Sequence, residues 1–178
     1  PRPLAPVPAV RGGVPTHHRS GPLRATIEAV LAQTFTDFEL LVCDDASTDD
    51  TAATVDLYAD PRIRYHRNAR NLGLYGNWNR CVELASGRYI AIYHDHDIYF
   101  PTILARSVAL LEKYPTAGFV HAASLIIAPD GRPAGLDIRS LPELTASRRM
   151  MQMIAGREES PVTAATAMVR REKYAAAG

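Results

Sequence analysis

The most informative stretch of the chain reads Tyr89-Ile90-Ala91-Ile92-Tyr93-His94-Asp95-His96-Asp97-Ile98-Tyr99-Phe100-Pro101. It opens with five apolar or aromatic residues, which have the β-branched and aromatic bias of a buried strand. Two carboxylates and two imidazoles follow immediately. Because open α/β folds bind ligands at the carboxyl ends of their strands, these ionisable groups are predicted to lie at a binding site.

The two acids of this stretch, Asp95 and Asp97, would project to the same side of an extended segment. Carboxylates held this close repel each other unless a cation lies beside them. Mg²⁺ suits such a pair, since it binds one or two carboxylates and completes its shell with water and phosphate oxygens. The same alternation directs His96 away from the acids, although His94 and His96 are also of a type that ligates softer divalent ions. The alternative is a solvated acidic turn that only ends the strand.

The length and composition are those of an ordinary globular domain. The chain has 178 residues, of which 47% are hydrophobic and 22% charged, so it can bury a sizeable core. A formal net charge of +1 gives no electrostatic reason to expect nucleic acid as a partner. No apolar run approaches the length of a membrane span. Cys43 and Cys81 are too few for a disulfide framework, so we expect buried thiols in a cytoplasmic protein.

The rest of the chain alternates between helix-like and strand-like segments. Apolar residues at helical spacing predict helices over residues 23–31, 78–85, 104–111 and 145–154. A further helix, capped by Ser47 or Thr48, is expected to run to about Tyr58. Strands are predicted over residues 38–43, 63–66, 89–93, 118–128 and 164–169, with a loop over 136–143. This alternation predicts an α/β fold, a doubly wound, Rossmann-like, mixed and mostly parallel sheet with helices on both faces.

The amino-terminal residues 1–13 are rich in proline and alanine. They are interpreted either as an extended tail or as a degenerate first strand. The strand candidate, residues 9–14, contains Gly12 and Gly13, and glycine weakens a strand.

Acidic residues also end a second predicted strand, at Asp44-Asp45. Two strand ends that carry acids can meet in one crevice, where a carboxylate accepts a hydrogen bond from a nucleobase or a ribose hydroxyl. Alternatively, Asp44 or Asp45 only caps the helix that follows. His17, in the loop after residue 14, can stack on a base, whereas an exposed pair with His18 is the plainer interpretation.

A group of amides and a glycine surrounds the start of another predicted helix, at Asn71, Gly73, Asn77 and Asn79. Helix amino ends attract phosphate, but asparagine is also common in turns. The chain contains neither a glycine-rich dinucleotide motif nor a P-loop, which disfavours both of those chemistries.

Together, these motifs resemble the family-2 glycosyltransferases of GT-A fold, which transfer a sugar from a nucleotide-sugar with inversion of configuration. The resemblance covers most of the chain from Val14 to about Ala123. It rests, in order, on Val14-Pro15-Thr16, Ala32-Gln33-Thr34-Phe35, Phe38-Glu39, Asp44-Asp45-Ala46-Ser47-Thr48-Asp49, Asn71-Leu72-Gly73, Asn79-Arg80, Ser86-Gly87-Arg88-Tyr89-Ile90 and Asp95-His96-Asp97.

The resemblance implies a binding site for a nucleotide-sugar, most simply a UDP-sugar. Asp45 would contact the base, and Asp95 would meet the ribose or the donor sugar. Asp95 and Asp97 would hold Mg²⁺ or Mn²⁺ on the diphosphate. The other implied nucleotide-sugar-binding residues are Pro15, Thr16, His17, Asp44, Asn71, Gly73 and Asn79.

The resemblance also implies partners and a division of the chain. The acceptor would be a saccharide or another hydroxyl compound. The cytoplasmic location expected from the cysteines leaves association with the inner face of the membrane open. Residues 14–128 would form the donor-binding core, and 129–178 the incomplete start of an acceptor-side region.

The chain departs from the family pattern at two points. His17-His18 stands where the family usually has Tyr-Asn. Inversion also needs a general base for the acceptor hydroxyl, which the family places in an acidic pair after a segment like Val169-Arg170-Arg171-Glu172. Glu158 and Glu159 come too early, so the base is expected beyond Gly178.

Three other functions stay open on the residues alone. A phosphatase of the haloacid-dehalogenase type also uses D-x-D after a strand, but near its amino end. A metal-dependent nucleotidyltransferase normally has an early loop rich in glycine and arginine, for which Arg11-Gly12-Gly13 is a faint counterpart. The third alternative is a nucleotide-binding module without turnover.

Overall fold

The computed structural model describes residues 8–137 and 164–175 of the chain. Within them, six strands form one sheet in the order β3-β2-β1-β4-β8-β5. Strands β1 to β4 are parallel, whereas β8 is antiparallel to both β4 and β5. The strands are β1 (Val10–Thr16), β2 (Phe38–Asp44), β3 (Ile63–Arg67), β4 (Tyr89–Ile92), β5 (Phe119–Val120) and β8 (Met168–Arg170). The mixed, mostly parallel sheet predicted from the sequence is therefore confirmed.

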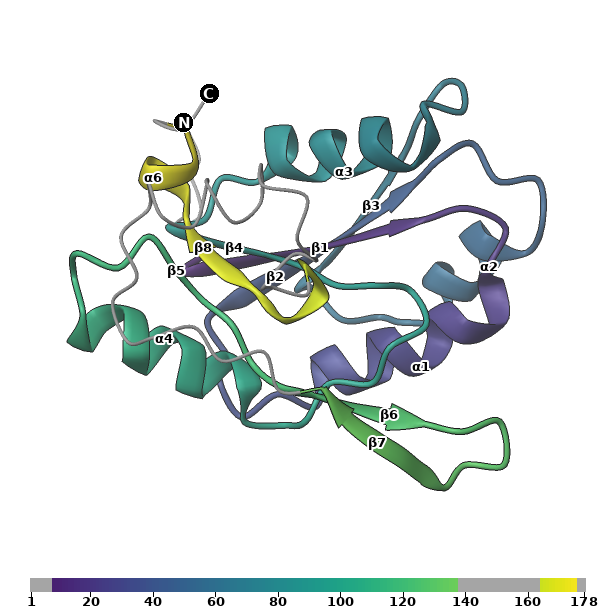
Figure 1. The fold of residues 1–178 in the computed structure, drawn as a ribbon. Helices are drawn as coiled ribbons and strands as arrows, with labels where there is room; N and C mark the ends of the chain where they lie inside the picture. The colour runs from purple at the N-terminus through teal and green to yellow at the C-terminus, as the bar shows by residue number, and fades with distance from the viewer. Residues whose placement is uncertain (1–7, 138–163, 176–178) are drawn as a thin grey trace, which may run out of the picture.

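Helices cover both faces of this sheet, as Figure 1 shows. Helix α3 lies on one face, and α1 and α4 lie on the other. The helices are α1 (Ser20–Leu31), α2 (Thr51–Asp56), α3 (Gly73–Leu84), α4 (Ile103–Lys113) and α6 (Arg171–Ala175). Among the helices of the described ranges, none is long and apolar enough to cross a membrane.

The core divides along the two faces of the sheet, because successive strand residues point to opposite sides. The larger cluster contains Val10 and Val14 of β1 together with Leu23 and Ile27 of α1. The smaller cluster, on the α3 side, consists of Leu41, Cys43 and Cys81. Both cysteines are buried and free, as expected.

The weakest predicted strand is in fact central to the sheet. β1 pairs with both β2 and β4 and extends to Thr16. Its two glycines leave space for side chains from elsewhere in the chain. A Cβ on Gly12 would lie 2.5 Å from Cε2 of Tyr93, and one on Gly13 would lie 2.9 Å from Cβ of Cys81. The glycines therefore allow close packing across the strand, which outweighs their low strand propensity.

We expect Gly12→Ala to destabilise the fold. The new methyl group would overlap the ring of Tyr93, which is buried and packs edge-on against Tyr99 at 4.5 Å between ring centroids. Overpacking of this kind costs about 1–3 kcal/mol, measurable by urea denaturation. Gly21→Ala is the control, because a Cβ at that position has nothing within 4 Å. Equal stability of the two variants would show that the Tyr93 ring moves aside freely.

Helix α2 is shorter than the sequence predicted. The helix expected from Ser47 or Thr48 to about Tyr58 spans only Thr51–Asp56. Two side chains bind backbone groups and delay its start: Oδ1 of Asp44 accepts from the Ser47 amide at 2.9 Å, and Oδ1 of Asp49 accepts from the Thr51 amide at 3.2 Å. Such local side-chain bonds compete with helix formation.

The segment after α4 also differs from expectation. The single strand predicted over residues 118–128 is divided into β5 in the main sheet and β6 (Ser124–Ile127), which forms an antiparallel hairpin with β7 (Pro133–Asp137). β7 includes the start of the loop predicted over 136–143. A 3-10 turn at Ala164–Thr166 precedes β8 where one strand was expected over 164–169. The helix predicted over 145–154 lies outside the described residues.

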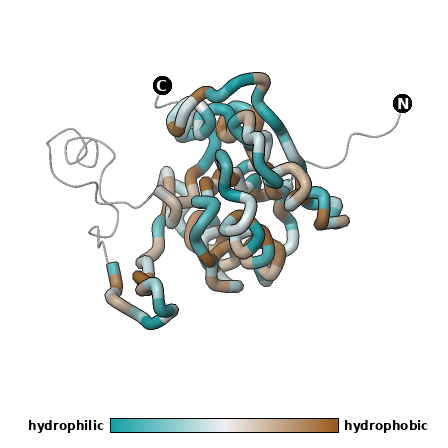
Figure 2. Tube along the Cα trace, turned by 90° about the vertical axis from the view of Figure 1, so that its right-hand side faces the viewer, coloured by the Kyte–Doolittle hydropathy of each residue, from teal (hydrophilic) through white to brown (hydrophobic). Residues whose placement is uncertain are grey.

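The β6–β7 hairpin lies apart from the sheet (Figure 1). In the turned view of Figure 2 it forms an arm with hydrophobic segments at the lower left of the molecule. The exposed fractions of its large apolar residues are 42% for Leu125, 53% for Ile126, 52% for Ile127 and 59% for Leu136. The hairpin therefore contributes little to the core.

Candidate functional site

A cleft of about 570 Å³ lies at the carboxyl ends of β1 and β4, where parallel sheets of this kind bind ligands. Four segments line it: the end of β1 with the loop after it, the residue after β2, the start of α3 and the turn after β4. Seven of the predicted site residues line it, namely Pro15, Thr16, His17, Asp45, Asn71, Gly73 and Asp95. The predicted residues Asp44, Asn79 and Asp97 lie outside this lining.

Asp45 organises one wall of the cleft. Its Oδ1 accepts hydrogen bonds from Nδ2 of Asn68 at 2.9 Å and from the amide of Leu72 at 2.8 Å. Its Oδ2 accepts from the amide of Gly73 at 2.9 Å. The residue is only 2% exposed, so these contacts are sheltered from water. Asp45 therefore fixes the segment that leads from β3 into α3.

Two asparagines extend this network into the core: Asn77, which the sequence analysis placed in the group of amides at the helix start, and Asn68, which it did not single out. Nδ2 of Asn68 also donates to Oδ1 of Asn77 at 2.9 Å, and Nδ2 of Asn77 donates to the Cys43 carbonyl at 2.8 Å. Asn77 lines the cleft, whereas the predicted Asn79 is exposed. Two positions along a helix correspond to about 200° of rotation, which explains why the two side chains face different ways.

The neighbouring acid, Asp44, turns away from the cleft and stabilises the sheet edge. Its Oδ2 accepts from the Tyr65 hydroxyl at 2.6 Å and lies 3.6 Å from Nε of Arg67, while its Oδ1 accepts from the Ser47 amide. Burial, followed by the bond to Asp44, raises the pKa of Tyr65. These contacts correspond to the capping alternative, in which Asp44 holds the turn before α2.

The two adjacent histidines lie stacked at the cleft mouth. Their ring centroids are 4.0 Å apart, and both side chains are exposed. Nε2 of His17 lies 3.1 Å from Nδ2 of Asn71, and Nε2 of His18 lies 3.2 Å from Oγ1 of Thr48. Of the two, His17 lines the cleft.

The segment after β4 is a turn, where the sequence analysis assumed an extended chain. The amide of Asp97 donates to the His94 carbonyl at 3.3 Å. Within this turn, Asp95 is buried: its Oδ2 accepts from Oγ1 of Thr16 at 2.7 Å, and its Oδ1 lies 3.1 Å from Nδ1 of His96. The expectation that His96 points away from the carboxylates is therefore wrong, because alternation of side chains holds only for extended backbone.

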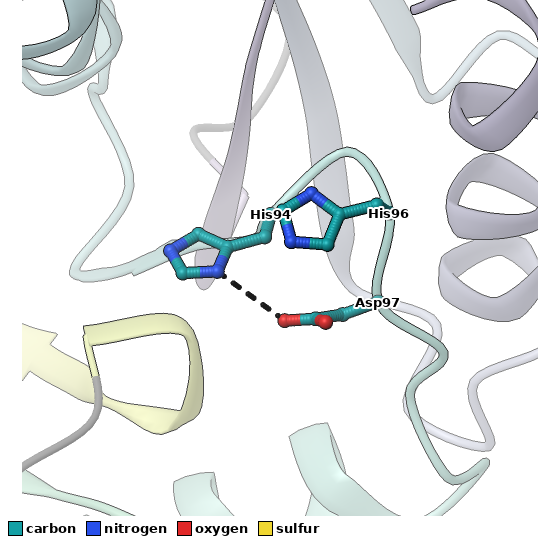
Figure 3. A group of neighbouring side chains, drawn as sticks. All are labelled: His94, His96 and Asp97. Atoms are coloured by element: carbon teal, nitrogen blue, oxygen red, sulfur yellow. Dashed lines mark ion pairs between the residues drawn. The ribbon is translucent and has the colours of Figure 1, made fainter. Parts of the chain in front are cut away.

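Three side chains of the turn converge in a way that suits a metal ion (Figure 3). One ligand atom from each of His94, His96 and Asp97 lies within 4.8 Å of the others. Nδ1 of His94 is 3.3 Å from Oδ2 of Asp97, and the hydrogen bond with His94, the larger effect, lowers the pKa of Asp97 despite partial burial. Asp95 is not a member of this group.

The order and direction of the strands and the cleft at their carboxyl ends are those of an α/β protein of GT-A fold. Residues 13–176 match the model of glycosyl transferase family 2, and the chain belongs to this family. This membership sets aside the phosphatase and nucleotidyltransferase alternatives.

Two curated relatives illustrate the match. The chain is 35% identical over 100 residues to the UDP-Glc:alpha-D-GlcNAc-diphosphoundecaprenol beta-1,3-glucosyltransferase WfgD of Escherichia coli, covering 56% of this chain and 40% of the relative. It is 32% identical over 145 residues to the succinoglycan biosynthesis protein ExoO of Rhizobium meliloti, covering 78% of this chain and 41% of the relative. The chain thus spans about two fifths of the length of these relatives.

Solved structures agree on the GT-A fold. TarS of S. aureus, residues 1–349, superposes with a TM-score of 0.65 at 21% identity, covering 91% of this chain and 47% of that one. The mannosyltransferase PcManGT from Pyrobaculum calidifontis, solved with GDP-Man and Mn²⁺, gives a TM-score of 0.59 at 25% identity. The match covers 73% of this chain and 40% of the mannosyltransferase.

Proposed function

We propose that this chain binds the donor of an inverting, metal-assisted glycosyltransferase that transfers a sugar from a UDP-sugar to an acceptor hydroxyl. The observation that carries the proposal is the cleft, which is lined by Asp45 and Asp95, from two different strand ends, and by His94 and His96, two members of a group able to bind a divalent cation. The names of WfgD, which uses UDP-Glc, and of PcManGT, bound to GDP-Man and Mn²⁺, support it.

In this proposal the base lies between the loop after β1 and the start of α3. Pro15, Thr16 and His17 form one side, with the exposed His17 ring available for stacking. A carboxylate offers about four acceptor positions, and Asp45 uses three of them within the protein. The remaining one is directed to a base N–H.

The diphosphate would lie toward Gly73 and the turn after β4. Asn71 and Gly73 line the cleft at the amino end of α3, where the helix dipole favours anions, and the Gly73 amide itself donates to Asp45 and Asn71. Asp95, held by Thr16, faces the ribose or the donor sugar, and Asp97 holds Mg²⁺ or Mn²⁺. His94 and His96 lie beside Asp97 and could add nitrogen ligands to a divalent cation, whose charge would offset the charge that develops on the leaving diphosphate.

Calorimetric titration with UDP tests this proposal. We expect binding in the presence of Mn²⁺, weaker binding after chelation, and weaker binding of GDP than of UDP. Asp97→Ala should weaken UDP binding by more than about tenfold, which corresponds to ~1.4 kcal/mol. The control is Asp56→Asn, which changes an exposed acid of α2 away from the cleft. UDP binding that is unaffected by chelation and by Asp97→Ala would overturn the metal-assisted donor site.

A further inference from the structure

We propose that Asn77 is a positioning residue for base recognition: its buried amide fixes the carboxylate of Asp45 and thereby sets a preference for uracil over cytosine. The inference rests on the proposed function, because it names the residue that orients the base contact of that same site. Asn77 lies on α3 and is only 3% exposed. The hydrogen-bond partners of its side chain belong to the ends of β1 and β2 and to the residue after β3.

A buried asparagine inside a helix is locally unfavourable, which points to a role for its amide. Asparagine lowers helix propensity, and a buried amide costs free energy unless its donor and acceptor groups are satisfied. Asn77 meets this requirement on both sides: its Nδ2 donates to the Cys43 carbonyl at 2.8 Å, and its Oδ1 accepts from Nδ2 of Asn68 at 2.9 Å. The side chain therefore connects α3 with the ends of two neighbouring strands.

The chemistry of the partners fixes the orientation of both amides. A backbone carbonyl and an ionised carboxylate can only accept, so Nδ2 of Asn77 must face Cys43 and Nδ2 of Asn68 must face Asp45. Oδ1 of Asn77 then accepts the second N–H of Asn68. Asn68 is only 6% exposed, so these bonds are sheltered from water. The series of bonds from Cys43 through the two asparagines to Asp45 thus has one consistent direction.

Asn77 also lies beside the junction between the ends of β1 and β2. The Asp45 amide donates to the Thr16 carbonyl at 2.9 Å, and Nδ2 of Asn77 lies 3.5 Å from the same carbonyl, a longer and weaker contact. Loss of the Asn77 amide would therefore release Asp45 mainly through Asn68, with a smaller effect through the strand end to which its backbone is bonded.

The position of this carboxylate decides which pyrimidine it can bind. Oδ2 of Asp45 accepts the Gly73 N–H and keeps one acceptor position for the base. Uracil carries an N–H at ring position N3, whereas cytosine has a lone pair there and an amino group beside it. A carboxylate aimed at N3 accepts from uracil and repels cytosine, but a displaced carboxylate can accept from the cytosine amino group. Discrimination therefore depends on how rigidly Asp45 is held.

Titration calorimetry with UDP and with CDP, each in the presence of Mn²⁺, tests the inference. We expect the wild type to prefer UDP by at least about tenfold, because a site built for a substrate N–H rejects an analogue that lacks it. Asn77→Ala should weaken UDP binding more than CDP binding and reduce this preference by at least about threefold, as the loss of one hydrogen bond would. A preference that Asn77→Ala leaves intact would overturn the inference, as would equal affinity of the wild type for the two nucleotides.

Cys81→Ala is the matched control, because Cys81 lies about one helical turn after Asn77 on the same helix. It is 1% exposed and packs with Leu41 and Cys43, outside the series of amide bonds. We expect this variant to lower the free energy of unfolding and to keep the preference for UDP. An equal loss of preference in Cys81→Ala would overturn the inference, because general packing of α3 would then hold the site.

Asn68→Ala shows whether Asn77 acts through this neighbour. In the Asn68→Ala background, Asn77→Ala should reduce the preference for UDP by a smaller factor than it does alone, because members of one network are not additive. Full additivity of the two changes would overturn the proposed route. Circular dichroism reports whether each variant is folded. If Asn77→Ala does not fold, Asn77→Ser replaces it with the same expectation, since a serine hydroxyl can bond to its own helix but is too short to keep both contacts.

A measurement without nucleotide separates this inference from the proposed function. The amides of Leu72 and Gly73 donate to Asp45, so their NMR chemical shifts report the position of its carboxylate. We expect both shifts to change in Asn77→Ala and to stay in place in Cys81→Ala. Changed shifts without any UDP binding by the wild type would overturn the donor-site proposal and leave Asn77 as the residue that holds Asp45. Unchanged shifts would overturn the inference, whether or not UDP binds.

Discussion

Glu39→Ala is expected to lower the free energy of unfolding by about 3–5 kcal/mol, the usual result of breaking a buried ion pair. Glu39 of β2 bonds to Arg11 of β1 and to Arg64 of β3, so its carboxylate joins three adjacent strands. The side chains of Arg11 and Glu39 are only 13% and 10% exposed. Burial, and then the charge of Arg64, lower the pKa of Arg11, and removal of Glu39 would leave this guanidinium without its carboxylate.

The position of Arg11 increases the expected loss. Its guanidinium also donates to the Leu84 carbonyl at the end of α3, so a rearrangement of Arg11 would disturb the helix that forms one wall of the cleft. Urea denaturation measures the change in unfolding free energy. If Glu39→Ala lowered the free energy of unfolding by less than about 1 kcal/mol, the contacts of Glu39 with Arg11 and Arg64 would contribute no more than surface ion pairs do.

Two further variants identify the origin of the loss. Arg64→Ala removes a side chain that is 67% exposed, and we expect a change of less than about 1 kcal/mol. In the double variant Arg11→Met, Glu39→Leu, apolar side chains replace the buried pair, and stability should approach that of the wild type. A large loss in the double variant would mean that the pair contributes a specific geometry that apolar packing cannot replace.

The fold class could be predicted from the sequence because it depends on local patterns. Alternation of apolar strands with amphipathic helices predicted the mixed sheet, and acids at Asp45 and Asp95 indicated its ligand-binding edge. The strength of β1 could not be predicted in this way. Gly12 and Gly13 are weak strand formers by themselves, and their role depends on Tyr93 and Cys81, which are distant in sequence.

The site was predictable only in part, because some of its contacts depend on a turn or on parts of the chain that are distant in sequence. Strand ends locate Asp45 and Asp95, but the backbone between His94 and Asp97 is a turn, so side-chain alternation gave the wrong direction for His96. The contribution of Asn68 depends on the end of β3 meeting the start of α3, and no local pattern encodes that contact. The only sequence signal was the density of asparagines between residues 68 and 79.

Asp45→Ala is expected to abolish measurable UDP binding and to destabilise the fold by about 1–3 kcal/mol, the usual cost of a buried donor left without a partner. That donor is the backbone amide of Leu72, because Nδ2 of Asn68 also donates to Asn77 and the Gly73 amide also donates to Asn71. Because Gly73 has a φ of +75°, the start of α3 depends on a backbone conformation that this carboxylate holds in place.

Asp45→Asn separates the two roles of the residue. The asparagine retains one oxygen for the Leu72 and Asn68 donors, but its amide group meets the Gly73 N–H and cannot accept from a base. We therefore expect hydrogen-exchange protection at Leu72 to persist while UDP affinity falls by more than about tenfold, or ~1.4 kcal/mol. Asp56→Asn, an exposed change of the same chemistry, should leave both unchanged. If Asp45→Asn binds UDP as tightly as the wild type, Asp45 only shapes the cleft wall, and the base must be recognised by the backbone and the residues of the loop after β1.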